Sequence, residues 1–233
     1  MNSKNSFRQA GFAFCILFCA TFFSCSKENA SDVNQSKIYS DYEVFYDSNS
    51  DKTWVVARFR FGGATGTILE LDSTAYVKFN ADTLPYNVVF QAHFKEYAGR
   101  VTTGTFTYRN LNNDVYVNTL PAYDTIAFAD DFDTIRKSVA NTIAWAGSPL
   151  AANDNVGIFI GGWQWGQAAL KLQTGAGATS MVLGTNETSS LQPGPATCYM
   201  DRATDVAITQ GTPEGGRIRG KYRARTKVVQ VVP

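Results

Sequence analysis

The chain has 233 residues, of which 44% are hydrophobic and 18% charged, and its formal net charge at pH 7 is +1. This balance excludes a whole-molecule positive field, so we expect no nucleic-acid partner. The length suffices for one large or two ordinary domains.

The first residues predict an export signal. Lys4 and Arg8 precede an uncharged, mainly apolar run at 10–23. A helix of this length reaches about 21 Å, which is short of the roughly 30 Å core of a bilayer. A basic start, a short apolar run and a small residue at its end are typical of a cleaved signal peptide rather than a buried core helix. We therefore expect residues 1–24 to be removed.

The junction F-F-S-C (22–25) resembles the lipobox of bacterial lipoproteins, in the relaxed form found in the Bacteroidota. It departs from the common pattern because Phe22 and Phe23 stand where Leu and a small residue are usual. The resemblance implies that Cys25 becomes the first residue and carries lipid, which anchors the protein to a membrane. Ser26 in place of Asp implies the outer membrane, with the body on either side of it.

The segment after the junction is polar and mixed in charge. Such a segment cannot bury enough apolar surface to offset its ordering entropy, so residues 25–37 are predicted to be a lipid-anchored flexible tether. Cys15 and Cys19 leave with the signal, and Cys198 remains as a lone thiol. We interpret Cys198 as a small buried residue in the strand A-T-C-Y-M rather than as a reactive group.

The body alternates between apolar and polar residues, which is the period of a β-strand. Three runs predict inward-facing side chains: Val55, Ala57, Phe59 and Phe61 in 53–61, Ala75, Val77 and Phe79 in 74–80, and Val88, Phe90, Ala92 and Phe94 in 86–94. Segments rich in Gly, Asn, Asp and Pro separate the runs, and no window has a helical stripe. We predict an all-β fold of antiparallel strands.

A break near T-L-P-A-Y-D (119–124) predicts two β-sandwich domains, at 38–120 and 121–233, with a single larger sandwich as the alternative. The stretch L-Q-P-G (191–194) before A-T-C-Y-M resembles the corner before strand F in immunoglobulin-like and fibronectin type III domains. The resemblance implies that Leu191 packs inward near a core Trp145, and that two immunoglobulin-like β-sandwiches stand in tandem. Domains of this kind usually adhere, space or bind.

No catalytic motif is recognisable in the sequence. The single histidine, His93, is predicted to be half exposed on its strand, and we find no G-x-S-x-G, H-E-x-x-H or phosphate loop. We therefore expect a non-catalytic protein without a cofactor. A hydrolase that uses two carboxylates stays open as an alternative.

The stretch A-D-D-F-D (129–133) gathers Asp130, Asp131 and Asp133, which Ca²⁺ could use. A solvated loop explains these residues better, so we expect no metal site.

The stretch G-G-W-Q-W-G-Q (161–167) suits a sugar ligand. Trp163 and Trp165 would share a face of an extended segment and stack on sugar rings, while Gln164 and Gln167 supply amides for hydroxyl groups. The alternative is that the rings plug one end of a sandwich, since tryptophan is more often buried than displayed.

The C-terminal stretch R-I-R-G-K-Y-R-A-R-T-K (217–227) places a cation at every second position. The six cations, which would share one face of a strand, are Arg217, Arg219, Lys221, Arg223, Arg225 and Lys227. The neighbouring strand adds Asp201 and Asp205, which cannot neutralise six cations. The functional interpretation is a ridge for an acidic glycan, lipopolysaccharide phosphate or an acidic protein, and the alternative is a solvated outer face.

Together these features predict a non-catalytic lipoprotein of the cell envelope that binds a glycan or an anionic envelope partner. The alternative is a structural or accessory subunit of an outer-membrane complex that has no ligand of its own.

Overall fold

The computed structural model describes residues 28–161 and 167–233, and the fold is all-β, with 54% of these described residues in strands and 5% in helices. This confirms the predicted fold class. Cys25, Trp163, Gln164 and Trp165 lie outside the described residues. Within the described part, no helix is long and apolar enough to cross a membrane.

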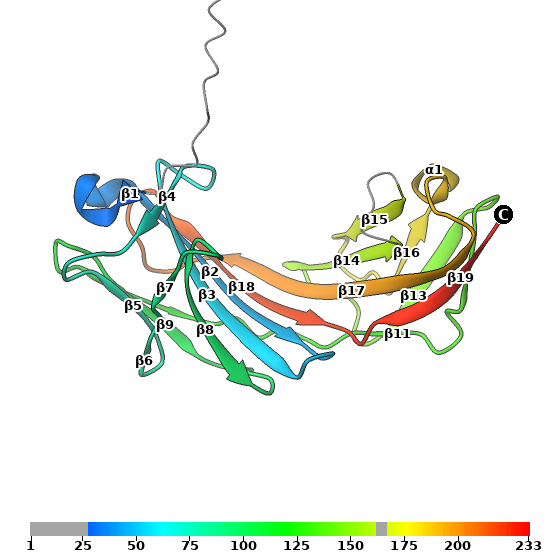
Figure 1. The fold of residues 1–233 in the computed structure, drawn as a ribbon. Helices are drawn as coiled ribbons and strands as arrows, with labels where there is room; N and C mark the ends of the chain where they lie inside the picture. Colours follow the sequence, from blue (N-terminus) through cyan, green and yellow to red (C-terminus); the bar gives the residue numbers. More distant parts are fainter. Residues whose placement is uncertain (1–27, 162–166) are drawn as a thin grey trace, which may run out of the picture.

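One twelve-stranded sheet runs the length of the molecule (Figure 1). Its main path follows the order β1 (Glu28–Asn29), β4 (Thr67–Glu70), β3 (Lys52–Phe61), β2 (Ile38–Asp47), β18 (Gly216–Arg223), β17 (Gly194–Ala207), β14 (Asp154–Gly161) and β15 (Ala168–Gln173). Four further strands attach beside this path: β7 (Tyr86–Asn87), β8 (Ala92–Ala98), β12 (Thr134–Arg136) and β19 (Lys227–Val232).

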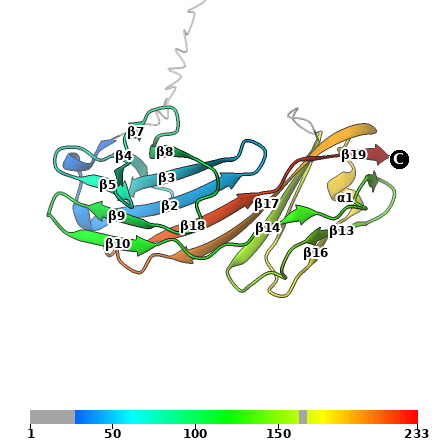
Figure 2. The same cartoon turned by 90° about the horizontal axis from the view of Figure 1, so that it is seen from below.

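Two small sheets cover one side of the large sheet (Figure 2). The four-stranded sheet contains β10 (Val115–Thr119), β9 (Thr105–Arg109), β5 (Tyr76–Phe79) and β6 (Asp82–Thr83), and the three-stranded sheet contains β11 (Ala127–Phe128), β13 (Asn141–Ala146) and β16 (Ser180–Leu183). The helical segments are short: η1 (Ala30–Asp32), η2 (Gln35–Lys37) and α1 (Thr185–Thr188).

Each small sheet closes its own hydrophobic core. In the N-terminal core, Tyr42 of β2 stacks on Phe106 of β9 with ring centroids 4.6 Å apart. The C-terminal core holds Leu191 and Trp145 together, as the strand F resemblance implies, and Cys198, which is fully buried there. The tandem immunoglobulin-like topology stays a prediction.

The two cores share one continuous sheet. β18 pairs in parallel with β2, so Ile218, from the C-terminal part of the chain, packs in the N-terminal core beside Tyr42. Two other pairs, β1 with β4 and β12 with β19, are also parallel, which the sequence did not predict. One sheet therefore joins the two cores, and the division into two domains after Leu120 stays a prediction.

The predicted flexible tether is wrong from Glu28 onwards. β1 pairs with β4, Ala30 is fully buried, and Ser31 bonds to the carboxylate of Asp72 through both its amide and its hydroxyl group. The Gln35 amide donates to the Ala30 carbonyl at 2.6 Å. Long-range partners thus order a segment whose own composition predicts disorder.

The predicted strand at 86–94 is also wrong, because a turn at 88–91 interrupts it. The Asn87 carboxamide oxygen accepts hydrogen bonds from the amides of Val89 and Phe90, and Gln91 has a positive φ of 47°. Such a side chain competes with the strand ladder for backbone donors. As a result Val88, expected to face inward, is 73% exposed.

Candidate functional site

The large sheet has one face that neither small sheet covers, and we call it the open face. Along each strand, side chains alternate between this face and the cores. In β17, for example, Arg202 is 1% exposed on the core side, whereas Asp201 and its neighbours at odd positions point to the open face. The strands β2, β14 and β18 place their odd-numbered residues on the same face through their register with β17.

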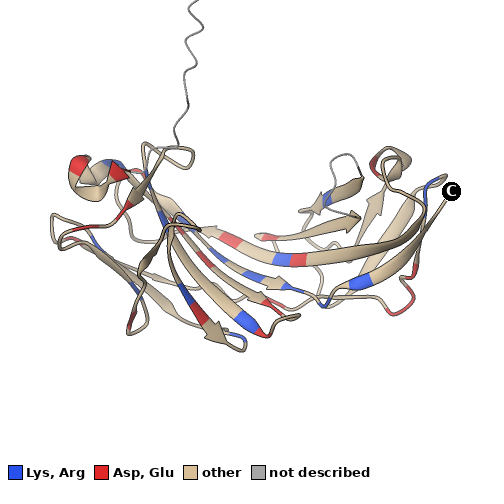
Figure 3. Ribbon diagram, in the orientation of Figure 1, with Lys and Arg blue, Asp and Glu red and all other residues tan. Residues whose placement is uncertain are grey.

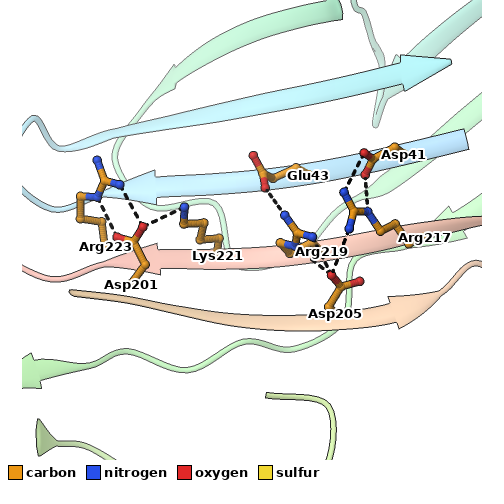
Figure 4. Close-up of polar contacts among 8 residues, drawn as sticks. All are labelled: Asp41, Glu43, Asp201, Asp205, Arg217, Arg219, Lys221 and Arg223. Carbon is orange, nitrogen blue, oxygen red and sulfur yellow. Dashed lines mark hydrogen bonds and ion pairs between the residues drawn. The ribbon is translucent and has the colours of Figure 1, made fainter. Parts of the chain in front are cut away.

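Charged residues of both signs lie along the middle strands of the large sheet (Figure 3), and those at odd positions of β2, β17 and β18 point to the open face. We call them the charge ladder, and Figure 4 shows its eight members: Asp41, Glu43, Asp201, Asp205, Arg217, Arg219, Lys221 and Arg223.

Arg217 and Arg219 form one half of the charge ladder. Arg217 makes a bidentate pair with Asp41, with Nε and Nη2 at 2.9 and 3.0 Å from its two oxygens. Arg219 bridges two carboxylates, Asp205 at 2.7 Å and Glu43 at 3.0 Å. Arg217 also lies 3.7 Å from Asp205, so both arginines join β18 to the neighbouring strand on each side.

Asp201 is the centre of the other half. Its carboxylate accepts from Arg223 Nε at 2.7 Å and from Lys221 Nζ at 2.8 Å. Burial raises the pKa of this carboxyl, but the hydrogen bond from Arg223 and the charge of Lys221 more than offset that effect, so its pKa is lowered. Asp201 is charged at neutral pH, and the ladder holds four cations and four carboxylates.

Arg225 and Lys227 do not belong to the charge ladder, so the prediction of six cations on one strand face is wrong. β18 ends at Arg223, and Ala224 is buried. Arg225 is exposed beyond the strand, and Lys227 donates to the carbonyls of Ala129 and Asp130 at 2.7 and 2.8 Å.

The loop at 129–133, which Lys227 contacts, carries three exposed aspartates. Asp130, Asp131 and Asp133 form no group of three metal-ligating side chains within residues 28–161 and 167–233.

Three hollows lie along the open face. The amide hollow, about 240 Å³, is lined by Gln167, Gln192 and Thr197 near Gly161. The ladder hollow, about 380 Å³, is lined by Asn155, Thr174 and the inner part of the charge ladder. The aromatic hollow, about 130 Å³, is lined by Glu43, Phe45, Trp54, Val56, Arg58, Phe90 and Phe94. Amides, hydroxyls and rings thus follow one another along a single surface.

Glycines make room for these hollows. A Cβ on Gly157 would meet nothing nearer than Leu172 Cδ1 at 3.8 Å, so the floor of the ladder hollow is open because a side chain is missing. At Gly161 the reason differs: φ is +111°, and a Cβ would lie 2.5 Å from the Gln167 carbonyl oxygen. Only glycine fits there.

Aromatic rings line the end of the face near β3. Phe45 and Trp54 meet edge to face at 5.2 Å, and the Trp54 indole donates to Glu96 Oε2 at 3.0 Å. The ring centroids of Phe90 and Phe94 lie 4.7 Å apart. No sequence motif marks these rings as a site, although the alternation at 53–61 places Trp54 opposite the core residues.

The two side chains most able to act as nucleophile or base are buried in structural roles. The Cys198 thiol is inaccessible, and burial raises its pKa to about 12. His93 is 5% exposed, so the prediction of a half-exposed histidine is wrong. Its two ring nitrogens bond to the amide of Leu71 and the carbonyl of Leu84.

No protein-family model matches the chain, and neither does any curated protein. Among solved structures, the chain is similar to one from a study of host cell surface retention of a 1.5-MDa bacterial ice-binding adhesin, with 10% sequence identity and a TM-score of 0.24. The alignment covers 85% of this chain and 66% of that chain, just under two thirds. A TM-score at this level carries no argument about function.

Proposed function

We propose that this protein is a non-catalytic lipoprotein of the outer membrane, held by lipid on Cys25, which binds a glycan along the open face. The observation that carries the proposal is the row of three hollows on one uncovered face of a continuous sheet. A row of this kind suits an extended ligand with repeating units. Amides and hydroxyls can bond to sugar hydroxyl groups, and the rings can stack on their C–H faces.

The balance of the charge ladder supports a neutral glycan over an anionic one. Each of its four cations already has a carboxylate partner within 3.0 Å. A phosphate or an acidic sugar would have to displace these carboxylates and leave them unpaired, which costs free energy at a half-buried site. An acidic glycan and lipopolysaccharide phosphate are therefore weaker candidates, and we propose no nucleic-acid partner.

A structural or accessory role in an envelope complex is the second candidate, and edge strand β15 favours it. Leu170 and Leu172 of this strand are 72% and 60% exposed on the open face. Exposed leucines beside an edge strand are typical of a protein contact. In this case an envelope protein would cover the amide hollow and the ladder hollow.

A glycan array probed with the mature chain tests the first proposal. We expect retention on neutral polysaccharides, with affinity that changes less than twofold between 50 and 500 mM salt, because the ligand brings no charge. Binding only to acidic glycans, with strong salt dependence, would contradict the neutral-glycan proposal. Failure to bind any glycan, together with one crosslinked envelope protein, would favour the accessory role.

A further inference from the structure

The turn at 88–91 is an unusual place for apolar side chains. Val88, Val89 and Phe90 are 73%, 82% and 50% exposed, and no residue from Tyr86 to Ala92 is charged. Exposed turns are usually built from Gly, Asn, Asp, Ser and Pro. Three consecutive apolar residues at a hairpin tip therefore indicate a surface that contacts a second apolar surface.

The folded body begins very close to the proposed lipid. Glu28 already pairs with Leu69 in β1 and β4, so three peptide links separate it from Cys25. Consecutive Cα atoms are 3.8 Å apart, so these links span at most about 11 Å whatever their conformation. With lipid on Cys25, the end of the body that carries β1 must lie on the membrane surface.

The hydrogen-bond pattern places the apolar turn at that same end. Asn29 pairs with Glu70, and the amide of the next residue, Leu71, donates to His93 Nε2 at 3.2 Å. His93 follows Ala92, the first residue of β8 after the turn. The turn is therefore connected to β1 through β4 and His93, by contacts between neighbouring residues. Figure 2 shows β4, β7 and β8 next to one another along one edge of the molecule.

We propose that the turn at 88–91 is a second membrane contact, at which the Val88 and Val89 side chains dock on a neutral lipid surface beside the lipid-anchored N-terminus, while Phe90 lines the aromatic hollow. This inference rests on the proposed anchor at Cys25. Lipid on Cys25 fixes one point of the body, and a second contact beside it makes the attachment firmer. It also fixes the orientation of the body, with the aromatic hollow nearest the membrane.

The membrane contact can be tested with a protein to which a lipid is attached chemically. The mature chain 25–233, which contains every described strand, is coupled at Cys25 to a single-chain maleimide lipid, and the buried Cys198 stays unreacted. Partition onto phosphatidylcholine vesicles is measured by sedimentation for three proteins. They are the unchanged chain, the Val89→Asp variant and the Val139→Asp variant. Val139→Asp is the matched control, because Val139 is also exposed in a turn, at 49%, but lies near the C-terminal core.

We expect Val89→Asp to lower the partition coefficient at least tenfold and Val139→Asp to leave it unchanged, with all three proteins melting at the same temperature. An equal partition coefficient for Val89→Asp and the unchanged chain would overturn the proposal. So would a dimer without vesicles that Val89→Asp alone dissociates, since the turn would then bind a second copy. Mass spectrometry of the mature N-terminus tests the anchor separately: unmodified Cys25 in cells would contradict the anchor and leave the vesicle result standing.

Discussion

His93 is fixed as one neutral tautomer by its surroundings. Nε2 accepts the Leu71 amide at 3.2 Å, so the proton lies on Nδ1, which donates to the Leu84 carbonyl at 3.0 Å. A second ring proton would point at the Leu71 N–H group. Burial lowers the pKa of His93, and the Leu84 carbonyl and Glu70 raise it by less. The neutral form is therefore the one that fits the fold.

The pH dependence of stability tests this assignment. The pKa of an unfolded histidine is about 6.5, and the folded value is lower, so His93 contributes stability that is fully present above pH 6.5 and is lost as pH falls toward the folded pKa. The chain has one histidine, so we expect the free energy of unfolding, measured in urea, to fall between pH 7.5 and 5.5. The glutamine of His93→Gln keeps one donor and one acceptor but does not titrate, so in this variant the loss of stability between pH 7.5 and 5.5 should disappear. An unchanged loss in His93→Gln would contradict the assignment.

Residue-scale predictions from the sequence succeeded where a strand is unbroken. Val55, Ala57 and Phe59 are fully buried, as their alternation predicts, and so is Val77. His93 was misplaced because the Asn87 side chain ends the strand and shifts the alternation that follows. No pattern of apolar residues reveals such a turn in advance.

At the scale of elements, β18 is the strand that joins the cores, and its backbone passes close to Tyr123. A Cβ on Gly220 would lie 2.4 Å from Tyr123 Cδ1 and 2.9 Å from its Cβ. The ring cannot easily move, because its hydroxyl donates to the Val101 carbonyl at 2.5 Å and the Arg100 guanidinium lies 4.8 Å from its centroid. Glycine at this position is thus a packing requirement.

We expect Gly220→Ala to lower the free energy of unfolding by about 1–3 kcal/mol, because overpacking displaces Tyr123. Gly157→Ala, in the nearby strand β14, is the matched control: its Cβ meets only ordinary contacts at 3.8 Å or more, so stability should stay equal or rise slightly. Urea unfolding of both variants measures the difference. Equal stability of the two variants would contradict the packing argument.

The sequence predicts which segments are strands better than it predicts their partners. The alternation at 53–61 and 74–80 corresponds to β3 and β5, whereas the parallel pairing of β18 with β2 joins residues about 176 positions apart. Because that pairing was not foreseen, Asp41 and Glu43 were missed as partners of the cations. Their own alternation in β2 was the available signal, but it names no partner.

At the scale of the whole molecule, the long sheet turns one face to the cores and the other to solvent. In Figure 1, β3 and β8 lie toward one end of this sheet, and β14 and β15 lie toward the other. With the turn at 88–91 on the membrane, the aromatic hollow beside β3 and β8 would lie nearest the lipid, and the amide hollow beside β14 and β17 would lie farther along the sheet. Four of the six cations that the sequence places on one strand face do share it, and Gln167 lines the amide hollow. It could not predict the hollows, because they arise from Gly157, Gly161 and neighbouring strands together.

The most direct test of the account is a calorimetric titration of the neutral glycan retained on the array against three proteins. Gly157→Leu adds a side chain over the floor of the ladder hollow, and Ala144→Leu adds the same side chain at an exposed strand position on the three-stranded sheet. We predict that Gly157→Leu raises the dissociation constant at least tenfold, while Ala144→Leu matches the unchanged chain. Equal affinity of Gly157→Leu and the unchanged chain would contradict glycan binding on the open face.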